Sequence, residues 1–472
     1  MILYILYQTL RGMILFILWY VVLMNGVSLL QMVSALFITP IYIKKARRQR
    51  NRHIGAAEYM IPVSILVPAH NEELTILDSI KSMLNLNYMN YEIIVINDGS
   101  DDKTLETVIN AFGLHKIIYP LRERLATKKI RGIYYNPDMP RLHLIDKENG
   151  GKSDALNAGI NLSRYPYILS LDADTLMEGD ALLRIAMAFI QDKYTIAVGG
   201  MIRVANGCRI NDGRITSVGL PDKFWALLQT IEYFRSFMVG RIGWNSFNSL
   251  CIISGAFAAF QKDAVLSVGG YTTGTVGEDM DLVIKLHRSM YSRHYKYKVS
   301  FLPDPVCWTQ VPDNLSTLHT QRRRWQIGLI DVLMRNRDMF FNRKYGVLGM
   351  LAMPYYHLFE LVSPVIELLG YILIPVAWFF GFLSLEAMIL FFTATIIFGI
   401  ITSLGSLVVE EFTNTEFINA GEAVKLSFLS IFENFFYRQL TVIFRLLGIF
   451  SYRKYKSAWG NMKRQKFNKT AK

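Results

Sequence analysis

A long uncharged stretch near the N-terminus is the first constraint on this chain of 472 residues. Residues 12–43 contain no Lys, Arg, Asp or Glu, whereas a helix that crosses a bilayer needs only about 20 apolar residues. The stretch is too long for a signal peptide and has no cleavage site of small residues. The alternative is a buried helix of a soluble protein. We predict an N-terminal transmembrane segment over residues 1–45.

Basic clusters flank the apolar parts of the chain. The run KKARRQRNR occupies 44–52, and RRRW (322–325) and RNRDMFFNRK (335–344) precede a second apolar part. Basic residues beside a span stay in the cytoplasm. Residues 46–330 are therefore predicted to form a cytoplasmic domain of a multi-pass plasma-membrane protein. The net charge of +13 mostly reflects these clusters, so no nucleic-acid partner is expected. The three cysteines have no paired spacing, which fits a reduced compartment.

The C-terminal part alternates apolar blocks with short polar segments. The blocks lie near 350–382, 385–409 and 424–450. After a basic interfacial segment at 331–345, they predict transmembrane or interfacial helices over 346–452, followed by a basic tail at 453–472. One N-terminal and three C-terminal spans would place that tail outside, against the positive-inside rule. The block at 424–450 is therefore expected to lie in the interface or to re-enter the membrane.

Charged residues lie within or beside these apolar blocks. They are Glu360, Glu367, Glu433, Arg438 and Arg445. Charges inside a span are costly and usually face a partner or a polar path. For Arg438 and Arg445, we prefer an interfacial position in which the side chain reaches out to the lipid headgroups.

The middle of the chain alternates strand and helix patterns. Strand-like runs such as VSILVPA and YEIIVIND are followed by segments with apolar residues at helical spacing. This alternation predicts a parallel sheet with right-handed crossovers. Ligands of such sheets bind beyond the carboxyl ends of the strands. The polar residues at these ends are therefore expected to converge: Asn71, Asp98, Lys152, Asp172 and Asp174.

The stretch SLDADTLMEGD places Asp172 and Asp174 one residue apart after a strand. Such a pair suits a hard divalent cation, Mg²⁺ or Mn²⁺, whose shell substrate phosphates complete. The alternative is a solvated turn that caps a helix beginning near Met177. Asp98 can bind the polar edge of a base or ribose. Lys152 follows two glycines and can approach a diphosphate, or it is an ordinary surface lysine. No P-loop and no G-x-G-x-x-G motif is present in the sequence, which argues against a kinase or a dinucleotide enzyme.

Two later motifs carry further candidate residues. TTGTVGEDMDLVIKLHR (272–288) places Glu278 and Asp279 at the start of an amphipathic helix, as helix caps or with one of them as a general base. HTQRRRWQIG (319–328) is basic and aromatic, as in an interfacial helix. The second motif also carries three side chains that could meet a ligand: Gln321, Arg324 and Trp325.

Taken together and in this order, these motifs resemble those of membrane-bound family 2 glycosyltransferases that build β-linked polysaccharides. That group includes cellulose, chitin, hyaluronan and poly-N-acetylglucosamine synthases. The matching residues are Asp98 in NDGS, Lys152 in GGKSDALNAG, DAD at 172–174, SGAF at 254–257, GED at 277–279 and QRRRW at 321–325. The resemblance covers about 60–330. It implies a GT-A type α/β domain, with a parallel-rich mixed sheet that binds a nucleotide sugar, flanked by transmembrane helices.

The resemblance also implies a role for each matching residue. Asp279 would be the general base, and Asp174 would hold Mg²⁺ or Mn²⁺ on the donor diphosphate. The residues implied to bind the UDP-sugar donor are Asp98, Lys152, Asp172, Gln321 and Arg324. The residues implied to bind the acceptor are Trp325, Ser254, Gly255 and Glu278.

The implied activity is processive, inverting polymerisation of a β-linked polysaccharide from UDP-N-acetylglucosamine or UDP-glucose, with translocation of the product. Its partners would be the donor, the growing glycan, the bilayer and a small membrane or export subunit. The sequence departs from the family in GED, where cellulose synthases have TED, and in Asn97 of NDGS. Three alternatives remain open: a β-glucan synthase that uses UDP-glucose, a non-processive transferase acting on a lipid phosphate, and an inactive subunit that serves as a scaffold or channel.

Overall fold

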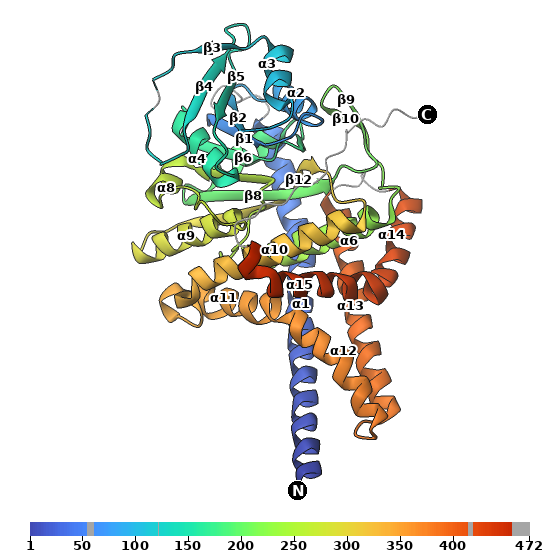
Figure 1. Cartoon of the computed structure of the whole chain (residues 1–472). Coiled ribbons are helices and arrows are strands. Elements are labelled where there is room, and N and C mark those ends of the chain that lie inside the picture. The colour runs from blue at the N-terminus through green and yellow to red at the C-terminus, as the bar shows by residue number, and fades with distance from the viewer. Residues whose placement is uncertain (54–60, 121, 414–418, 456–472) are drawn as a thin grey trace.

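The computed structural model describes residues 1–53, 61–120, 122–413 and 419–455 (Figure 1). A globular α/β domain occupies the upper part of this view, and apolar helices extend below it. The long helix α1 (Ile2–His53) runs through both parts, so its lower half stands apart from the domain while its upper half packs against it.

A ten-stranded mixed sheet forms the centre of the domain, in the order β3-β4-β5-β2-β1-β6-β11-β8-β12-β7. The strands are β1 Val63–Ala69, β2 Tyr91–Asp98, β3 His115–Ile117, β4 Ile130–Tyr135, β5 Leu142–Lys147, β6 Tyr167–Leu171, β7 Thr175–Met177, β8 Thr195–Val204, β11 Phe257–Gln261 and β12 Lys298–Thr309, with β9 Arg209–Asn211 and β10 Arg214–Ser217 in a separate hairpin. Strands β5, β2, β1 and β6 pair in parallel, and β11 runs antiparallel between β6 and β8. The predicted parallel-rich α/β sheet is therefore confirmed.

The register of the parallel strands brings their carboxyl ends to one edge of the sheet. Ala69 of β1 lies beside Asn97 of β2, and Asp98 lies beside Lys147 of β5. These strands are buried along their length, as expected for apolar strands with helices on both faces. The polar residues that follow each strand consequently meet at this edge, as the sequence predicts.

The helices beside the sheet follow the expected apolar spacing. They are α2 Ile76–Leu84, α3 Thr104–Phe112, α4 Lys152–Leu162, α5 Ala181–Gln191, α8 Lys262–Ser267 and α9 Glu278–Ser292. In α2, for example, Ile76, Ile80 and Met83 share the buried face. One expectation is wrong: no helix begins near Met177, because that residue lies in β7, which pairs with β12, and α5 begins at Ala181.

A layer of helices separates the sheet from the apolar part. It contains α6 Phe224–Phe234, the π-helix η2 Arg235–Arg241, α7 Ile242–Asn245 and α10 Leu315–Arg335. The predicted domain boundary at residue 330 falls within α10, which continues into the basic segment that was expected to be interfacial. The short helical turns η3 Arg337–Met339 and η4 Arg343–Tyr345 complete that segment.

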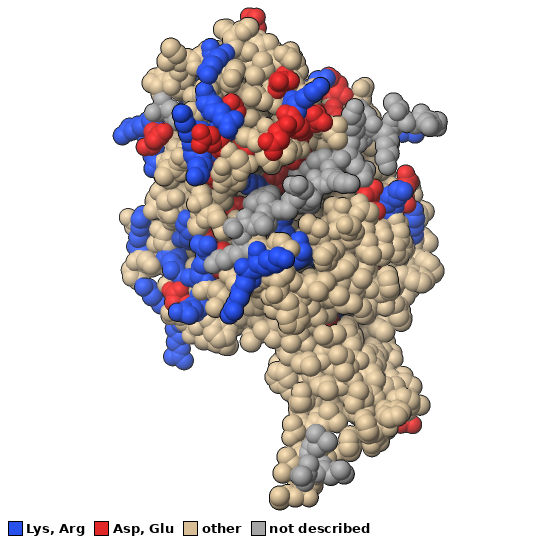
Figure 2. Space-filling model, in the orientation of Figure 1, with Lys and Arg blue, Asp and Glu red and all other residues tan. Residues whose placement is uncertain are grey.

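Within the described residues, two helices are long and apolar enough to cross a membrane, over Tyr7–Ala46 and Leu385–Thr413. A bent pair, Leu348–Leu361 and Ser363–Phe379, would make a third if it acts as one span. The first part of this pair consists of η5 Leu348–Ala352, α11 Met353–Tyr355 and η6 Tyr356–Leu361, and its second part is α12 Ser363–Phe379. The span over Leu385–Thr413 is helix α13. Figure 2 shows that the lower part of the molecule carries almost no charge, while Lys and Arg gather above it.

The last apolar block is broken into three pieces, α14 Ala420–Phe432, the π-helix η7 Glu433–Tyr437 and α15 Arg438–Tyr455. Helix α15 contacts α10 and lies across the direction of α1 (Figure 1). Whether residues 424–450 lie in the interface or re-enter the membrane stays a prediction.

Candidate active site

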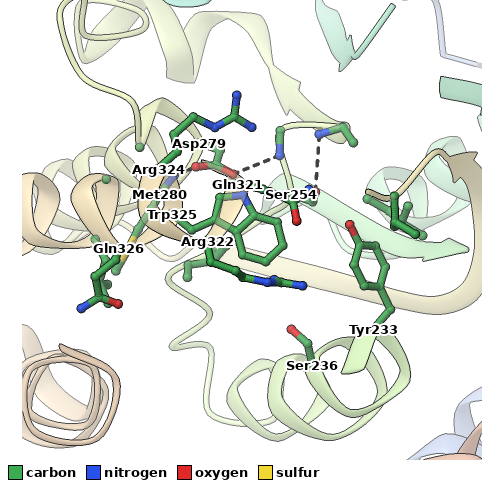
Figure 3. Close-up of a pocket in the computed structure, with 18 of the residues that line it drawn as sticks. Tyr233, Ser236, Ser254, Asp279, Met280, Gln321, Arg322, Arg324, Trp325 and Gln326 are labelled. Atoms are coloured by element: carbon green, nitrogen blue, oxygen red, sulfur yellow. Dashed lines mark hydrogen bonds between the residues drawn. The ribbon is translucent and has the colours of Figure 1, made fainter. Parts of the chain in front are cut away.

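One cavity of about 1320 Å³ is lined by residues at the carboxyl edge of the sheet and by residues of helices α6, α9 and α10. Its wall contains all of the site residues predicted from the sequence: Asp98, Lys152, Asp172, Asp174, Ser254, Gly255, Glu278, Asp279, Gln321, Arg324 and Trp325. These residues come from distant parts of the chain, so their convergence is a property of the fold. Figure 3 shows part of this wall, with Asp279 and Trp325 on one side and Tyr233 and Ser236 opposite.

Asp98 is buried and holds the turn that leads into α4. Its Oδ1 accepts hydrogen bonds from Lys147 Nζ at 2.6 Å and from the Gly150 amide at 3.0 Å. Its Oδ2 accepts one from the Gly151 amide at 2.7 Å. A carboxylate has about four acceptor positions, so Oδ2 can still accept a donor from a ligand. Asp98 therefore shapes the glycine turn as well as the cavity wall.

Asn97, whose role the sequence left open, lies beneath the site. It is buried, and its side-chain amide donates to Asp146 Oδ1 at 2.8 Å, which links β2 to β5. It is not part of the cavity wall described above. Its role in the structure is to join two strands.

Lys152 is the cationic centre of the site. Its ammonium forms an ion pair with Asp172, lies 3.6 Å from a Glu278 oxygen and donates to the Gly255 carbonyl at 3.2 Å. Burial disfavours its charge, but Asp172 and Glu278 more than offset that effect and raise its pKa to about 12. Lys152 is therefore no ordinary surface lysine, and it stays charged at neutral pH.

Asp279 and Glu278 open α9 and face different surroundings. Burial raises the pKa of Glu278; Lys152 opposes this shift and the charge of Asp279 adds to it. Asp279 is less buried, and its Oδ2 accepts a hydrogen bond from the Gly255 amide at 3.1 Å (Figure 3). A Cβ on Gly255 would lie 2.9 Å from Lys152 Nζ and 3.6 Å from Asp279. Gly255 thus leaves room for Asp279 and Lys152 to approach the same backbone segment.

Close packing between α9 and α10 explains why residue 277 of the GED motif is a glycine. A Cβ on Gly277 would lie 3.0 Å from the carbonyl oxygen of Gly328, and a Cβ on Gly328 would lie 3.1 Å from Gly277 Cα. The two glycines let the start of α9 meet α10 closely. Because α9 carries Asp279 and α10 carries Trp325, this contact fixes the candidate base relative to the candidate acceptor platform.

Helix α10 contributes three predicted residues to the cavity. Trp325 is 44% exposed, an unusual state for a tryptophan inside a cavity wall and one that leaves indole surface for a ligand. Gln321 is buried, and its Oε1 has no hydrogen-bond partner within the described ranges. An unpartnered buried acceptor is unfavourable, so a ligand or water donor is expected there.

The structure adds residues that the sequence did not single out. Arg322, Tyr233 and Arg241 also line the cavity. Arg322 lies within the QRRRW motif, and its spacing of three from Trp325 was the available signal. Tyr233 and Arg241 belong to no motif, and only the fold brings them to the site.

The cavity continues to the charged residues of the apolar blocks, including Glu360, Glu367, Arg438 and Arg445. Arg438 pairs with Glu367 at 3.2 Å, and Arg445 pairs with Glu360 at 3.4 Å and donates to Gln326 Oε1 at 2.9 Å. The expectation that Arg438 and Arg445 reach out to the headgroups is therefore wrong. Each arginine instead finds a buried or half-buried acid beside the cavity, which lowers the cost of its charge.

Comparison with curated proteins points in the same direction as the motifs. Poly-beta-1,6-N-acetyl-D-glucosamine synthase of Staphylococcus aureus (strain COL) is 33% identical over 282 residues, which are 60% of this chain and 57% of that protein. The synthase of Staphylococcus epidermidis is 32% identical over 274 residues, 58% of this chain and 56% of that protein. The chain thus spans somewhat more than half the length of the curated relatives it matches.

Among solved structures, a mannosyltransferase from Pyrobaculum calidifontis in complex with GDP-Man and Mn²⁺ is 19% identical, with a TM-score of 0.49 over 88% of this chain and 99% of that chain. S. aureus TarS 1–349 in complex with UDP-GlcNAc is 13% identical, with a TM-score of 0.37 over 84% of this chain and 92% of that chain.

Two family models cover most of the domain and part of the apolar region. The model "Glycosyl transferase family 2" matches residues 64–265, and "Glycosyl transferase family group 2" matches residues 167–402, half of the chain. The first begins one residue into β1, and the second extends from β6 into α13. With the mixed, parallel-rich sheet expected of a GT-A type domain, these matches show that the chain belongs to glycosyltransferase family 2.

Proposed function

We propose that this protein is a processive, inverting glycosyltransferase that polymerises a β-linked polysaccharide from a UDP-sugar, with UDP-N-acetylglucosamine as the first candidate donor. One observation carries the proposal: the candidate donor site, base and acceptor platform share a cavity that continues among charged residues of the apolar helices. The names of the similar staphylococcal proteins favour N-acetylglucosamine over glucose.

The reaction needs one base and a stabilised leaving group. Asp279 would take the proton from the acceptor hydroxyl as that oxygen bonds to the anomeric carbon and the bond from this carbon to the diphosphate breaks. UDP would leave with the bonding electron pair. Lys152, which stays charged, and Arg324 would stabilise the charge that develops on the diphosphate. Attack opposite the leaving group inverts the anomeric centre, so an α-linked donor gives a β-linked product.

A divalent cation fits the acids at the sheet edge. Among the described residues, no group of three or more His, Cys, Asp or Glu side chains is placed to hold a metal. Asp174, 5% exposed, and Asp172 line the cavity, so the chain offers a short carboxylate set that phosphate oxygens would complete. Mg²⁺ and Mn²⁺ accept this type of donor set. When bound, the cation would supply positive charge to the diphosphate, with Asp174 as its main protein ligand.

The polar continuation of the cavity supports translocation of the product. Past Trp325, the wall contains Tyr355 and Phe359 and then the two ion pairs that involve Arg438 and Arg445. Aromatic faces and paired charges offer a sugar chain stacking and hydrogen bonds without a fixed register. With the candidate spans and the basic clusters above them, this arrangement supports a multi-pass protein whose α/β domain faces the cytoplasm.

The test is UDP release by the full chain in detergent with Mg²⁺ or Mn²⁺, across a panel of UDP-sugars, followed by digestion of the product with linkage-specific hydrolases. We expect turnover with one donor and a long, digestible product. Transfer of a single sugar to an added lipid phosphate, without polymer, would favour the non-processive alternative. Absence of UDP release with every donor and metal, in protein that still binds UDP, would contradict the proposal.

Trp325→Ala should shorten the product. The half-exposed indole offers a stacking surface beside Asp279. Stacking of a nucleobase on an aromatic side chain contributes about 1–3 kcal/mol, and we take this as the scale for a sugar face. We expect the mean product length to fall about tenfold or more while the KM for the donor changes little. Size-exclusion analysis of radiolabelled product measures this. An unchanged length distribution would remove Trp325 from the acceptor site.

A further inference from the structure

The three arginines of QRRRW point to three different places. Arg324 lines the cavity, whereas the guanidinium carbon of Arg323 lies 4.5 Å from the ring centre of Tyr455 on α15. The guanidinium carbon of Arg322 lies 4.2 Å from the ring centre of Trp325, within the range of a cation–π contact. Arg322 therefore touches the candidate acceptor platform.

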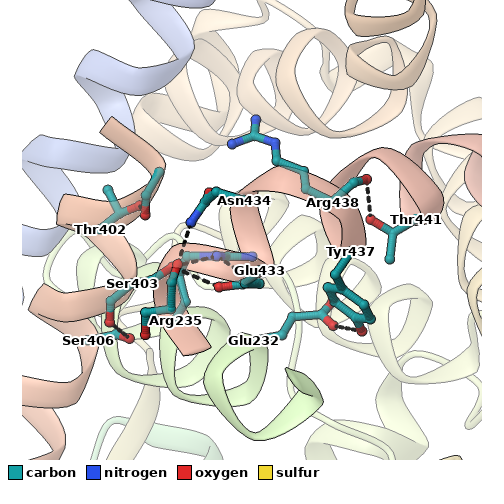
Figure 4. Close-up of polar contacts among 12 residues, drawn as sticks. Glu232, Arg235, Thr402, Ser403, Ser406, Glu433, Asn434, Tyr437, Arg438 and Thr441 are labelled. Carbon is teal, nitrogen blue, oxygen red and sulfur yellow. Dashed lines mark hydrogen bonds and ion pairs between the residues drawn. The ribbon is translucent and has the colours of Figure 1, made fainter. Parts of the chain in front are cut away.

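Arg322 is held in place by two other segments. Its Nη2 donates to Glu232 Oε2 on α6 at 2.7 Å and to the Tyr437 hydroxyl on η7 at 3.2 Å. The Tyr437 hydroxyl in turn donates to the same Glu232 oxygen at 2.6 Å (Figure 4). The three side chains thus close a hydrogen-bonded triangle, in which each pair is in contact. Arg322 and Tyr437 are only 3% and 2% exposed, so water does not compete effectively for these bonds.

The remaining donors of Arg322 are buried beside the cavity wall. Within the described part of the chain, its Nε and Nη1 are buried and have no hydrogen-bond partner. Arg322 also belongs to the cavity wall (Figure 3). A planar guanidinium that is fixed at one end therefore presents its other donors beside the indole of Trp325.

A second set of contacts, separate from the triangle of Arg322, Glu232 and Tyr437, already attaches η7 to the helix layer. Glu433, one turn before Tyr437, pairs with Arg235 at 2.7 Å and accepts from Ser403 at 2.9 Å (Figure 4). That neighbouring pair joins η7 to the same helix layer without touching Trp325. The contact that reaches the acceptor platform is the one through Tyr437, Glu232 and Arg322.

We propose that Arg322 is a positioning residue for the acceptor: Glu232 and Tyr437 hold its guanidinium against Trp325 and so fix the indole surface that the growing glycan meets. The C-terminal π-helix η7 thereby sets product length, because the end of the glycan dissociates more readily from a loosened platform. This inference rests on the proposed polymerase function. It adds a residue pair outside the donor site, Glu232 and Tyr437, that determines how long the product stays bound.

The test is Tyr437→Phe in the full chain, which removes one hydroxyl group and keeps the buried ring. We expect the mean product length to fall about fivefold, the weight of the one hydrogen bond that the hydroxyl accepts from Arg322, with the KM for the UDP-sugar unchanged. The matched control is Tyr452→Phe, because the Tyr452 hydroxyl of α15 likewise bonds to a residue of α10, donating to Asp331 at 3.2 Å, six residues after Trp325. The control should leave product length at the wild-type value.

Glu232→Gln serves as a second variant, since it keeps the shape of the side chain and weakens the hold on Arg322. It should shorten the product in the same direction as Tyr437→Phe. Wild-type length in both variants, with a wild-type enzyme that makes long polymer, would overturn this inference and leave the proposed function intact. A wild-type protein that releases UDP without forming polymer would overturn the proposed function, and this inference with it.

Discussion

Replacing Asp279 by Asn is expected to slow sugar transfer about a thousandfold or more, in line with the contribution of a positioned general base. The Asn side chain has nearly the same shape, but it cannot accept a proton from the acceptor hydroxyl. The Asp279 carboxylate does not take part in the Lys152–Asp172 ion pair, so affinity for UDP should stay within about threefold. Single-turnover transfer and equilibrium binding of UDP measure the two quantities separately.

Asp281→Asn is the matched control for this experiment. Asp281 lies two residues further along α9, is buried, and accepts a hydrogen bond from Thr272 Oγ1 at 2.5 Å, outside the cavity wall described for Asp279. Its replacement should lower the free energy of unfolding, because a buried charged hydrogen bond is lost, yet keep most of the activity. Appreciable transfer by Asp279→Asn would show that another group acts as the base.

Much of the site could be predicted because its residues follow strands. Parallel strands end at one edge, so Asp98, Asp172 and Asp174 had to come close once the strand pattern was correct. The helix that carries the candidate base was also recognisable, since its glycine-rich turn and apolar spacing are local signals. These local signals were enough to bring the residues of the candidate donor site to one part of the cavity wall.

The features that the sequence could not predict depend on distant partners. Arg438 and Arg445 meet acids 71 and 85 residues earlier in the chain, and nothing near the arginines indicates such partners. When no acidic partner can be recognised in the sequence, a position at the membrane surface has a lower free-energy cost for an arginine than a position inside a span. The strand β7 was missed for a related reason: three residues show no periodicity, and only pairing with β12 makes them a strand.

The glycine in GED shows how packing explains a departure from a motif. A threonine at position 277 would place its Cβ 3.0 Å from the Gly328 carbonyl oxygen, closer than ordinary side-chain contacts. The glycine at position 277 is therefore explained by its close contact with Gly328 on α10, and it does not indicate which substrate is used. The same contact brings α9 against α10, so the two motifs form a single unit even though more than 40 residues separate them.

Removal of divalent metal is expected to abolish UDP release, a loss of about a thousandfold or more, since a bound cation stabilises the leaving diphosphate by several kcal/mol. Chelation followed by return of Mg²⁺ or Mn²⁺ should restore activity in the wild type. Asp174→Ala should behave like the chelated enzyme even at saturating metal, because no group of three potential ligands is available among the described residues to replace it. Donor binding measured with and without metal gives a second readout.

Variants of the two acids of the DAD motif should differ in how their donor binding depends on metal. Asp172 forms an ion pair with Lys152. Asp172→Asn removes the ion pair that holds Lys152 in position, so donor binding should weaken in the absence of metal as well. Asp174→Ala should weaken donor binding only where metal contributes to it. Asp180→Asn, in the same stretch but paired with Arg184 at 2.7 Å, is the control and should retain metal-dependent turnover. Equal metal dependence in the wild type and Asp174→Ala would contradict the assignment of Asp174 as the metal ligand, because the cation would then be held by other oxygens.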